Sequence, residues 1–360
     1  MRPPRATTPA IPAPMTIEHP SALGYRAVGE WARNAACFTA WPAHAYAWGE
    51  FLDDAQREFV GFCEALLSEP DNEPLELLVP DAEAERSART ALSRFGARVR
   101  CRILQVGDVW LRDTAPIFVR SERGLGSVRF AFNGWGGKYA YLGDAQLAAR
   151  LQQQLALPAF AYDLITEGGA LELDGEGTCL TTESCLLGDN RGAPSREHVE
   201  QVLGQALSAE RVLWLAGGLL GDHTDGHIDN IARFAAPGVV VHMRPSDGDP
   251  NADTLRAIEA ALATFTDARG RKLTLHAVPS PGAVLDREGQ PMAASYMNFY
   301  LANKSVIVPT FGSPHDDAAL AALAPLFPGR RVVGRRANAI LEGGGGTFHC
   351  MTRQQPEAAP

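Results

Sequence analysis

The sequence predicts an α/β fold of about five supersecondary units, each with two strands, a helix and a further strand. Apolar segments of strand length and amphipathic segments of helical length follow one another in this order along most of the chain. Polar residues interrupt the apolar pattern at intervals of roughly 50 to 70 residues. They are Asp113, Glu167, His227, Asn298 and Cys350.

This quasi-period is typical of a radial repeat, because equivalent strand ends of a propeller-like ring meet at its axis. Each unit would then send one polar residue to a common place. A doubly wound α/β sheet is the alternative, since no sequence identity between the units is visible. The 360 residues do not decide between them, because single α/β domains also reach this length.

The composition is that of an ordinary globular protein, with 46% hydrophobic and 21% charged residues. A formal net charge of −9 makes nucleic acid and anionic membranes poor partners and favours a small cationic substrate. No apolar run approaches the roughly 18 residues of a transmembrane helix. The six cysteines form no CxxC pair, and we expect a reducing, cytoplasmic location because no signal peptide is visible.

The chain is expected to begin with a disordered tail. Residues 1–16 contain five prolines and no apolar periodicity, and Met15 could be an alternative start. Residues 17–360 are predicted to form a single catalytic domain.

Strand and helix patterns then alternate along the first half of the chain. In the helix at 53–68, apolar side chains recur from Phe59 at i, i+3, i+4, i+7 and i+8. The other predicted helices here are 82–95 and 143–155, and the strands are 36–41, 75–79, 99–105, 117–120, 128–132 and 160–164.

The second half continues the alternation, with Gly175-Glu176-Gly177 as a tight turn between two strands. The predicted strands are 171–174, 178–182, 212–215, 231–234, 239–242, 273–278, 295–300, 305–309 and 331–333. The predicted helices are 196–207, 253–265 and 316–326.

Four consecutive glycines at 343–346 are followed closely by a single cysteine, Cys350. Glycine allows backbone to approach a ligand closely and to adopt positive φ. We therefore expect the last strand to pass close to the ring axis and Cys350 to act there as a nucleophile. The alternative is a surface loop that carries an incidental cysteine.

A guanidinium ion fits the surrounding residue types. Its fixed fork of N–H donors suits two carboxylates, which Asp113 and Asp229 could supply. A thiolate would attack its central carbon. His227, expected to share one strand face with Asp229, could protonate the leaving ammonia and then activate water. Glu167 could orient His227 as the third member of a triad.

Other readings of these residues remain open. Arg112-Asp113 could be an internal ion pair, Glu167 a turn residue, and 222–229 a solvated surface turn. The protein could also bind a guanidinium without catalysis. A sharper alternative is a metal-dependent hydrolase, because one short segment holds five potential ligands. These are Asp222, His223, Asp225, His227 and Asp229, with His349 close to Cys350 in the sequence.

Several segments in this order carry a family resemblance over nearly the whole chain. They include Trp110-Leu111-Arg112-Asp113, Asn133-Gly134-Trp135-Gly136-Gly137, Glu167-Gly168-Gly169, Thr224-Asp225-Gly226-His227-Ile228-Asp229-Asn230, Ser295-Tyr296-Met297-Asn298 and 343–350. The chain resembles the agmatine deiminases, close to the Porphyromonas-type peptidyl-arginine deiminases, within the guanidino-group-modifying superfamily.

The resemblance implies a five-bladed α/β propeller, or pentein, of ββαβ units. It implies hydrolysis of agmatine to N-carbamoylputrescine and ammonia in polyamine biosynthesis, without metal or cofactor, and leaves a homodimer open. The implied roles are nucleophile for Cys350, general acid/base for His227, its acidic partner for Glu167, guanidinium clamps for Asp113 and Asp229, and a cation–π wall for Trp110.

Two departures from the family pattern bear on the substrate's far end. His223 stands where many members have Glu, and Arg353 stands where Gln is usual. An inward-pointing Arg353 would favour arginine or peptidyl-arginine, because an α-carboxylate needs a cation. The sequence does not identify the residue that would hold the distal amine of agmatine.

Overall fold

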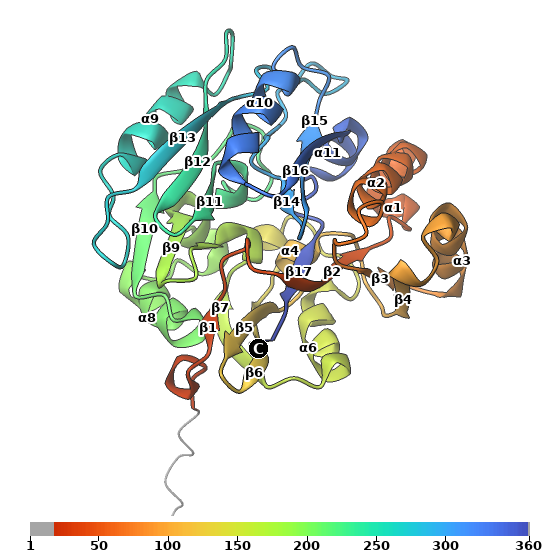
Figure 1. The fold of residues 1–360 in the computed structure, drawn as a ribbon, viewed down its shortest axis with the longest axis horizontal. Coiled ribbons are helices and arrows are strands. Elements are labelled where there is room, and N and C mark those ends of the chain that lie inside the picture. Colours follow the sequence, from red (N-terminus) through yellow and green to blue (C-terminus); the bar gives the residue numbers. More distant parts are fainter. Residues whose placement is uncertain (1–17, 359–360) are drawn as a thin grey trace, which may run out of the picture.

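Five small sheets make up the framework of the computed structural model, which describes residues 18–358. They surround a common centre, and most of the longer helices lie at the outer side of the ring (Figure 1). The predicted five-bladed α/β propeller is therefore confirmed. The doubly wound alternative is wrong, because the strands form separate sheets instead of one continuous sheet. The predicted tail at 1–16 lies outside the described residues.

One pattern of strand pairing recurs around the ring. In one blade, β11 (Ala232–Ala236) pairs antiparallel with β12 (Val239–Arg244). Helix α9 (Ala252–Leu262) then leads to β13 (Thr274–Pro279), which lies parallel to β12. A helix suits this step, because parallel neighbours need a long crossover connection.

Three further blades repeat this order of elements. They are β5 (Ile117–Ser121), β6 (Gly124–Ala131), α6 (Asp144–Leu155) and β7 (Ala159–Ile165); β8 (Glu172–Leu173), β9 (Thr178–Thr182), α8 (Arg196–Leu207) and β10 (Arg211–Leu215); and β14 (Tyr300–Leu301), β15 (Ser305–Thr310), α10 (Asp316–Leu323) and β16 (Arg331–Arg336).

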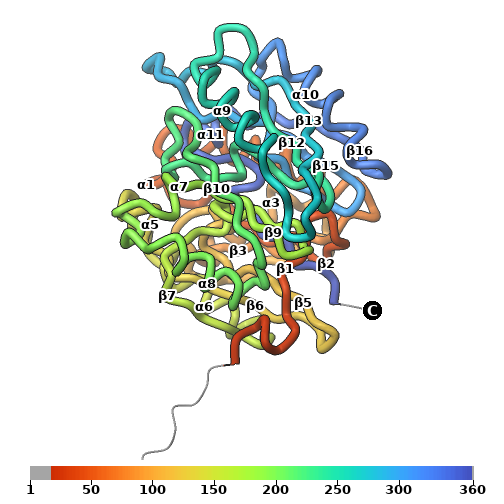
Figure 2. Tube along the Cα trace, turned by 90° about the vertical axis from the view of Figure 1, so that its left-hand side faces the viewer, coloured from red at the N-terminus to blue at the C-terminus, as the bar shows by residue number. Residues whose placement is uncertain are grey.

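The remaining blade joins the two ends of the chain. Strand β17 (Arg353–Pro356) pairs antiparallel with β2 (Asn34–Ala40), so the C-terminal strand completes a sheet begun near the N-terminus. The side view shows the blue end of the chain running beside β2 (Figure 2). The other elements of this blade are α2 (Leu52–Leu67), β3 (Leu75–Val79), α3 (Ala82–Ala91) and β4 (Val99–Ile103), and β1 (Arg26–Ala27) extends the sheet of β5.

In helix α2, the apolar side chains that recur at helical spacing in the sequence pack into the core. Phe59, Phe62, Cys63, Leu66 and Leu67 are all buried, as their spacing predicts. The inner strands are buried along most of their length, and β9 is buried at every position. No helix in residues 18–358 has the length and apolar character that a bilayer span requires.

Two predictions of local structure near the C-terminal end of the chain are wrong. Of the strand expected at 295–300, only Tyr300 lies in a strand, and the loop before it carries Asn298. The glycine run at 343–346 is not one loop, since Gly343 and Gly344 end helix α11 (Asn338–Gly344). A Cβ at Gly344 would lie 2.3 Å from the Trp110 ring, so glycine is needed there for space. Cys350 then lies in a turn ahead of β17.

Ring closure can be tested by shortening the chain. A chain that stops after Thr352 keeps Cys350 but lacks β17 and its backbone hydrogen bonds to β2. Each such bond contributes about 1 kcal/mol, so we expect a lower urea midpoint. A chain that stops after Glu357 is the control and should unfold like the full chain. Equal midpoints for all three would show that β17 does not hold the ring closed.

Candidate active site

The predicted polar residues meet near the centre of the ring. Asp113 lies in the short helix α4 (Leu111–Thr114) ahead of β5, and Glu167 follows β7. His227 precedes the 3₁₀ helix Ile228–Asn230, which contains Asp229. The strand expected over 227–229 is therefore wrong. The two side chains still reach the same site, because a Cβ at Gly169 would lie 2.6 Å from His227 Nδ1 and 3.1 Å from Asp229 Oδ2.

The Cys350 thiol is buried among polar groups. Its Sγ accepts a hydrogen bond from Asn298 Nδ2 at 3.0 Å and lies 3.5 Å from Asp229 Oδ2. Burial, followed by the charges of Asp229 and Asp113, raises the pKa of the thiol well above its ordinary value. A bound cation would reverse the electrostatic part of this effect and favour the thiolate.

His227 lies between two carboxylates. Its Nδ1 is 3.8 Å from Asp113 Oδ1 and its Nε2 is 3.6 Å from Glu167 Oε2. Burial opposes the charged form, but Asp113, Cys185 and Glu167 raise the pKa of His227 well above its ordinary value. The imidazole therefore carries a proton that it can donate near neutral pH.

Glu167 is fixed by a buried arginine that the sequence did not single out. Arg191 Nε donates to Glu167 Oε1 at 2.9 Å, and neither side chain is exposed. Arg191 Nη1 also lies 3.0 Å from Asp225 Oδ2. Only the fold brings Arg191 to Glu167, since no local pattern marks it as a partner.

Asp113 is held by two N–H donors. Trp135 Nε1 donates to Oδ2 and the backbone N–H of Gly169 donates to Oδ1, both at 2.9 Å. Burial raises the pKa of Asp113, and His227 opposes the shift. Trp135 is itself buried.

Asp229 has one oxygen engaged and one free. Its Oδ2 accepts from His349 Nδ1 at 2.7 Å, whereas its buried Oδ1 has no hydrogen-bond partner. Burial alone would raise the pKa of Asp229, but the hydrogen bond and charge of His349 lower it below its usual value. The carboxylate is therefore ionised and offers Oδ1 to a donor.

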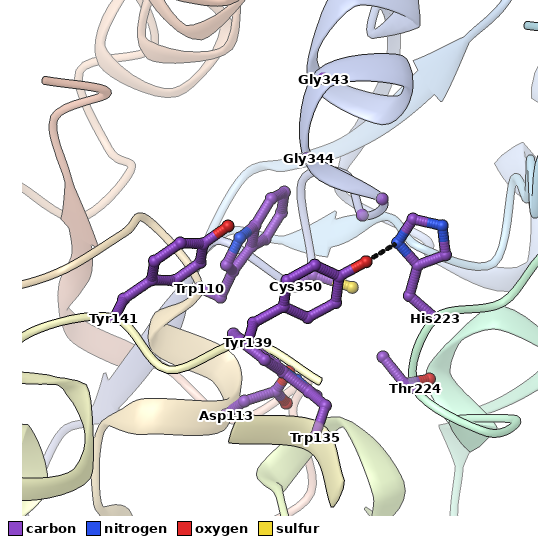
Figure 3. A pocket seen from close by; sticks show the side chains of 12 residues that line it. Trp110, Asp113, Trp135, Tyr139, Tyr141, His223, Thr224, Gly343, Gly344 and Cys350 are labelled. Atoms are coloured by element: carbon purple, nitrogen blue, oxygen red, sulfur yellow. Dashed lines mark hydrogen bonds between the residues drawn. The ribbon is translucent and has the colours of Figure 1, made fainter. Parts of the chain in front are cut away.

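A narrow pocket leads to this centre (Figure 3). It encloses about 540 Å³ of empty space, its mouth included, and among the described residues Asp113 is the only carboxylate that lines it. Trp110 forms part of the wall. The other side chains of the lining are Trp135, Tyr139, Tyr141, His223, Thr224 and Cys350.

Two buried carboxylates lie behind the aromatic wall. Asp108 accepts from the indole N–H groups of Trp110 at 2.7 Å and Trp48 at 3.0 Å, and burial raises its pKa to about 6. Asp144 accepts from the Gly107 N–H at 2.7 Å, and burial raises its pKa to about 7. Near neutral pH Asp108 is mostly ionised, and its negative charge favours a cation in the pocket.

The two departures from the family pattern have different positions. His223 lines the pocket, and its Nδ1 lies 2.9 Å from the Tyr139 hydroxyl. Arg353 does not line it, because its guanidinium donates to the backbone carbonyl of Arg112 and borders a separate cavity. Among residues 18–358, no arginine or lysine lines this pocket.

The five ligands of the metal alternative do not converge. Asp225 contacts Arg191 and Lys138, His223 contacts Tyr139, and Asp229 contacts His349. Within residues 18–358, two groups of His, Cys and carboxylate atoms are close enough to share an ion. They are Glu167, Cys185 and His227, and Glu30, Glu172 and His349.

A thiol, an imidazole and paired carboxylates at the axis of a five-bladed α/β propeller define a guanidino-group-modifying enzyme. The chain belongs to the Porphyromonas-type peptidyl-arginine deiminase family, whose sequence model matches residues 26–356.

Named relatives cover almost the full chain. A Legionella pneumophila protein named "Putative agmatine deiminase" is 37% identical over 345 residues, 94% of this chain and 97% of that protein. The structure titled "Agmatine deiminase of Enterococcus faecalis catalyzing its reaction" has a TM-score of 0.88 at 29% identity, covering 96% of this chain and 99% of that one. A "Putative Arginine Deiminase" from Porphyromonas gingivalis has a TM-score of 0.83 at 34% identity, covering 91% and 97%.

Replacing Gly169 tests how tightly the centre is packed. A Cβ there would lie 2.6 Å from His227 Nδ1 and 2.9 Å from Asp113 Oδ1. We expect Gly169→Ala to lower kcat/KM by about 100-fold, because displacement of a catalytic group by about 1 Å has that effect. Gly61→Ala is the control, since its Cβ would meet only Arg335 Cδ at 3.8 Å. Equal activities of the two variants would contradict this geometry.

Asp144 should make stability depend on pH. Its pKa is about 7 in the folded protein and about 4 in an unfolded chain. A raised folded pKa gives stability that is complete below pH 4 and is lost as pH rises to 7. The stability of Asp144→Asn relative to the parent should therefore increase between pH 4 and pH 8, as urea unfolding would measure. A parallel change in exposed Asp71→Asn would refute this origin.

Proposed function

We propose that the protein hydrolyses agmatine to N-carbamoylputrescine and ammonia through a covalent amidino intermediate on Cys350. The observation that carries the proposal is the convergence of thiol, imidazole and two carboxylates at the base of a narrow aromatic pocket. It would thus be a hydrolase of carbon–nitrogen bonds in linear amidines. A cytoplasmic role in putrescine biosynthesis follows from that reaction.

Binding would pair the substrate cation with the two carboxylates of the site. Asp113 and the unpartnered Oδ1 of Asp229 would accept N–H bonds from the guanidinium. Trp110 would contribute a cation–π contact, and its indole N–H bond to Asp108 strengthens the negative character of the ring. The bound cation would also offset the carboxylates that disfavour the Cys350 thiolate.

The reaction would proceed in two halves. When the cation binds, the Cys350 thiol gives up its proton to solvent. The thiolate attacks the central carbon, and His227 gives its proton to the leaving nitrogen, so that the C–N bond breaks and ammonia departs. His227 then takes a proton from a water molecule as its oxygen attacks the same carbon. The C–S bond breaks, the thiolate is restored and the ureido product leaves. Glu167, held by Arg191, keeps His227 oriented.

The walls of the pocket favour agmatine over the alternatives. Arginine would need a cation for its α-carboxylate, and Arg353 faces a separate cavity. The rings of Tyr139 and Tyr141 offer apolar and cation–π surface to the four-carbon chain and amine of agmatine. Arginine and peptidyl-arginine are the second candidates, because one related structure is named an arginine deiminase.

Release of ammonia from agmatine, arginine and a peptidyl-arginine, assayed in parallel, tests the proposal. We expect agmatine to be preferred and EDTA to have no effect. Cys350→Ser should lower kcat by at least about 1,000-fold, because the nucleophile is lost. Cys101→Ser, at a half-buried position, is the matched control. No turnover of any of the three compounds would refute the proposed enzyme, and inactivation by EDTA would favour the metal alternative.

A further inference from the structure

His349, the residue before the proposed nucleophile, is buried between two carboxylates. Its Nδ1 lies 2.7 Å from Asp229 Oδ2, and its Nε2 lies 2.9 Å from Glu30 Oε1. Only 1% of the residue is exposed, and it does not line the substrate pocket. The imidazole therefore connects Asp229 of the candidate site to Glu30.

The partners of His349 restrict how it can move. Glu30 also accepts hydrogen bonds from Arg112 Nη1 at 2.8 Å and from Arg233 Nη2. Arg233 Nε donates in turn to Glu172 Oε2 at 2.8 Å. These residues come from segments far apart in the sequence, so the ring as a whole fixes the imidazole.

The backbone of His349 is fixed beside the thiol as well. Its N–H donates to Asn298 Oδ1 at 3.0 Å, and Asn298 Nδ2 donates to Cys350 Sγ at 3.0 Å. The imidazole and the thiol are thus held relative to one another. The side chain of His349 contacts the site directly through Asp229.

Within the described part of the chain, His349 is the only side-chain donor within hydrogen-bond distance of the Asp229 carboxylate, apart from the Cys350 thiol at 3.5 Å. A hydrogen bond to Oδ2 sets the plane of the carboxylate and hence the direction of Oδ1. Oδ1 is buried and has no hydrogen-bond partner. Its direction therefore decides whether it can accept a linear hydrogen bond from an N–H group of a guanidinium.

We propose that His349 is a positioning residue for guanidinium binding. It holds Asp229 so that Oδ2 stays beside the thiol and Oδ1 is presented to the substrate. The inference rests on the guanidinium site of the proposed function, but it does not depend on which tail the substrate carries.

Replacing His349 by Asn or by Gln tests the two contacts of its imidazole separately. An Asn side chain at 349 ends near the position of Nδ1, so its N–H can still donate to Asp229. A Gln side chain reaches the position of Nε2, so it can contact Glu30 but leaves Asp229 without its donor. The pair therefore isolates the bond to Asp229 from the burial of a polar side chain.

The test measures binding without turnover, by calorimetry in a Cys350→Ser background. We expect His349→Gln to weaken agmatine binding by about 10-fold or more, because Asp229 loses its orientation. His349→Asn should bind agmatine within about threefold of the parent. Putrescine, which has the amine and carbon chain but no guanidinium, should bind all three forms alike.

Three results would overturn the proposal: equal loss in both variants, no loss with His349→Gln, or a parallel loss for putrescine. If the Gln variant does not fold, a 10-fold loss in His349→Asn would also overturn it. Turnover of agmatine by the unaltered protein is measured first. If it is absent, the proposed substrate is wrong, and methylguanidine replaces agmatine as the binding probe of the same site.

Discussion

The charges at the centre of the ring can be buried only because each finds a partner from another part of the chain. Glu167 pairs with Arg191, and Glu30 pairs with Arg112 and Arg233. Removing one member of such a buried pair costs about 3–5 kcal/mol, since the other charge stays desolvated and alone. The ion pairs that allow the blades to close around buried charges therefore also hold the side chains of the site in place. Closure of the ring and the geometry of the site depend on the same pairs.

A few buried polar atoms at the centre have no hydrogen-bond partner, and these atoms indicate what kind of ligand the site can bind. Asp229 Oδ1 and both nitrogens of His227 are buried without hydrogen-bond partners. Buried polar atoms of a folded protein are normally satisfied, so a cluster of exceptions marks a place for a ligand. Of these atoms, Asp229 Oδ1 is an acceptor, whereas the nitrogens of His227 can supply a proton, so the unpartnered groups suit a ligand that offers an N–H donor and takes up a proton as it reacts.

The fold class and the main residues of the candidate site can be predicted from the sequence, because both are marked by recurring patterns. Paired strands and a recurring polar residue predict the ring, and the glycine-flanked motifs predict Cys350, Glu167 and the His227 segment. The supporting residues leave no such signal. Arg191 meets Glu167, and Trp135 meets Asp113, only through the arrangement of blades. Asn298 was visible as a polar interruption, but its strand was predicted wrongly because tertiary contacts replace the local pairing there.

The position of Cys350 just ahead of β17 has a consequence for biosynthesis. Strand β17 closes the ring, so the proposed nucleophile and the closing strand leave the ribosome together, after every other blade. At about 5–20 residues per second, the growing chain spends tens of seconds without either. A nascent or prematurely terminated chain that lacks this segment has neither Cys350 nor the closing strand. If Cys350 is the nucleophile, as proposed, catalytic competence is reserved for chains whose ring can close.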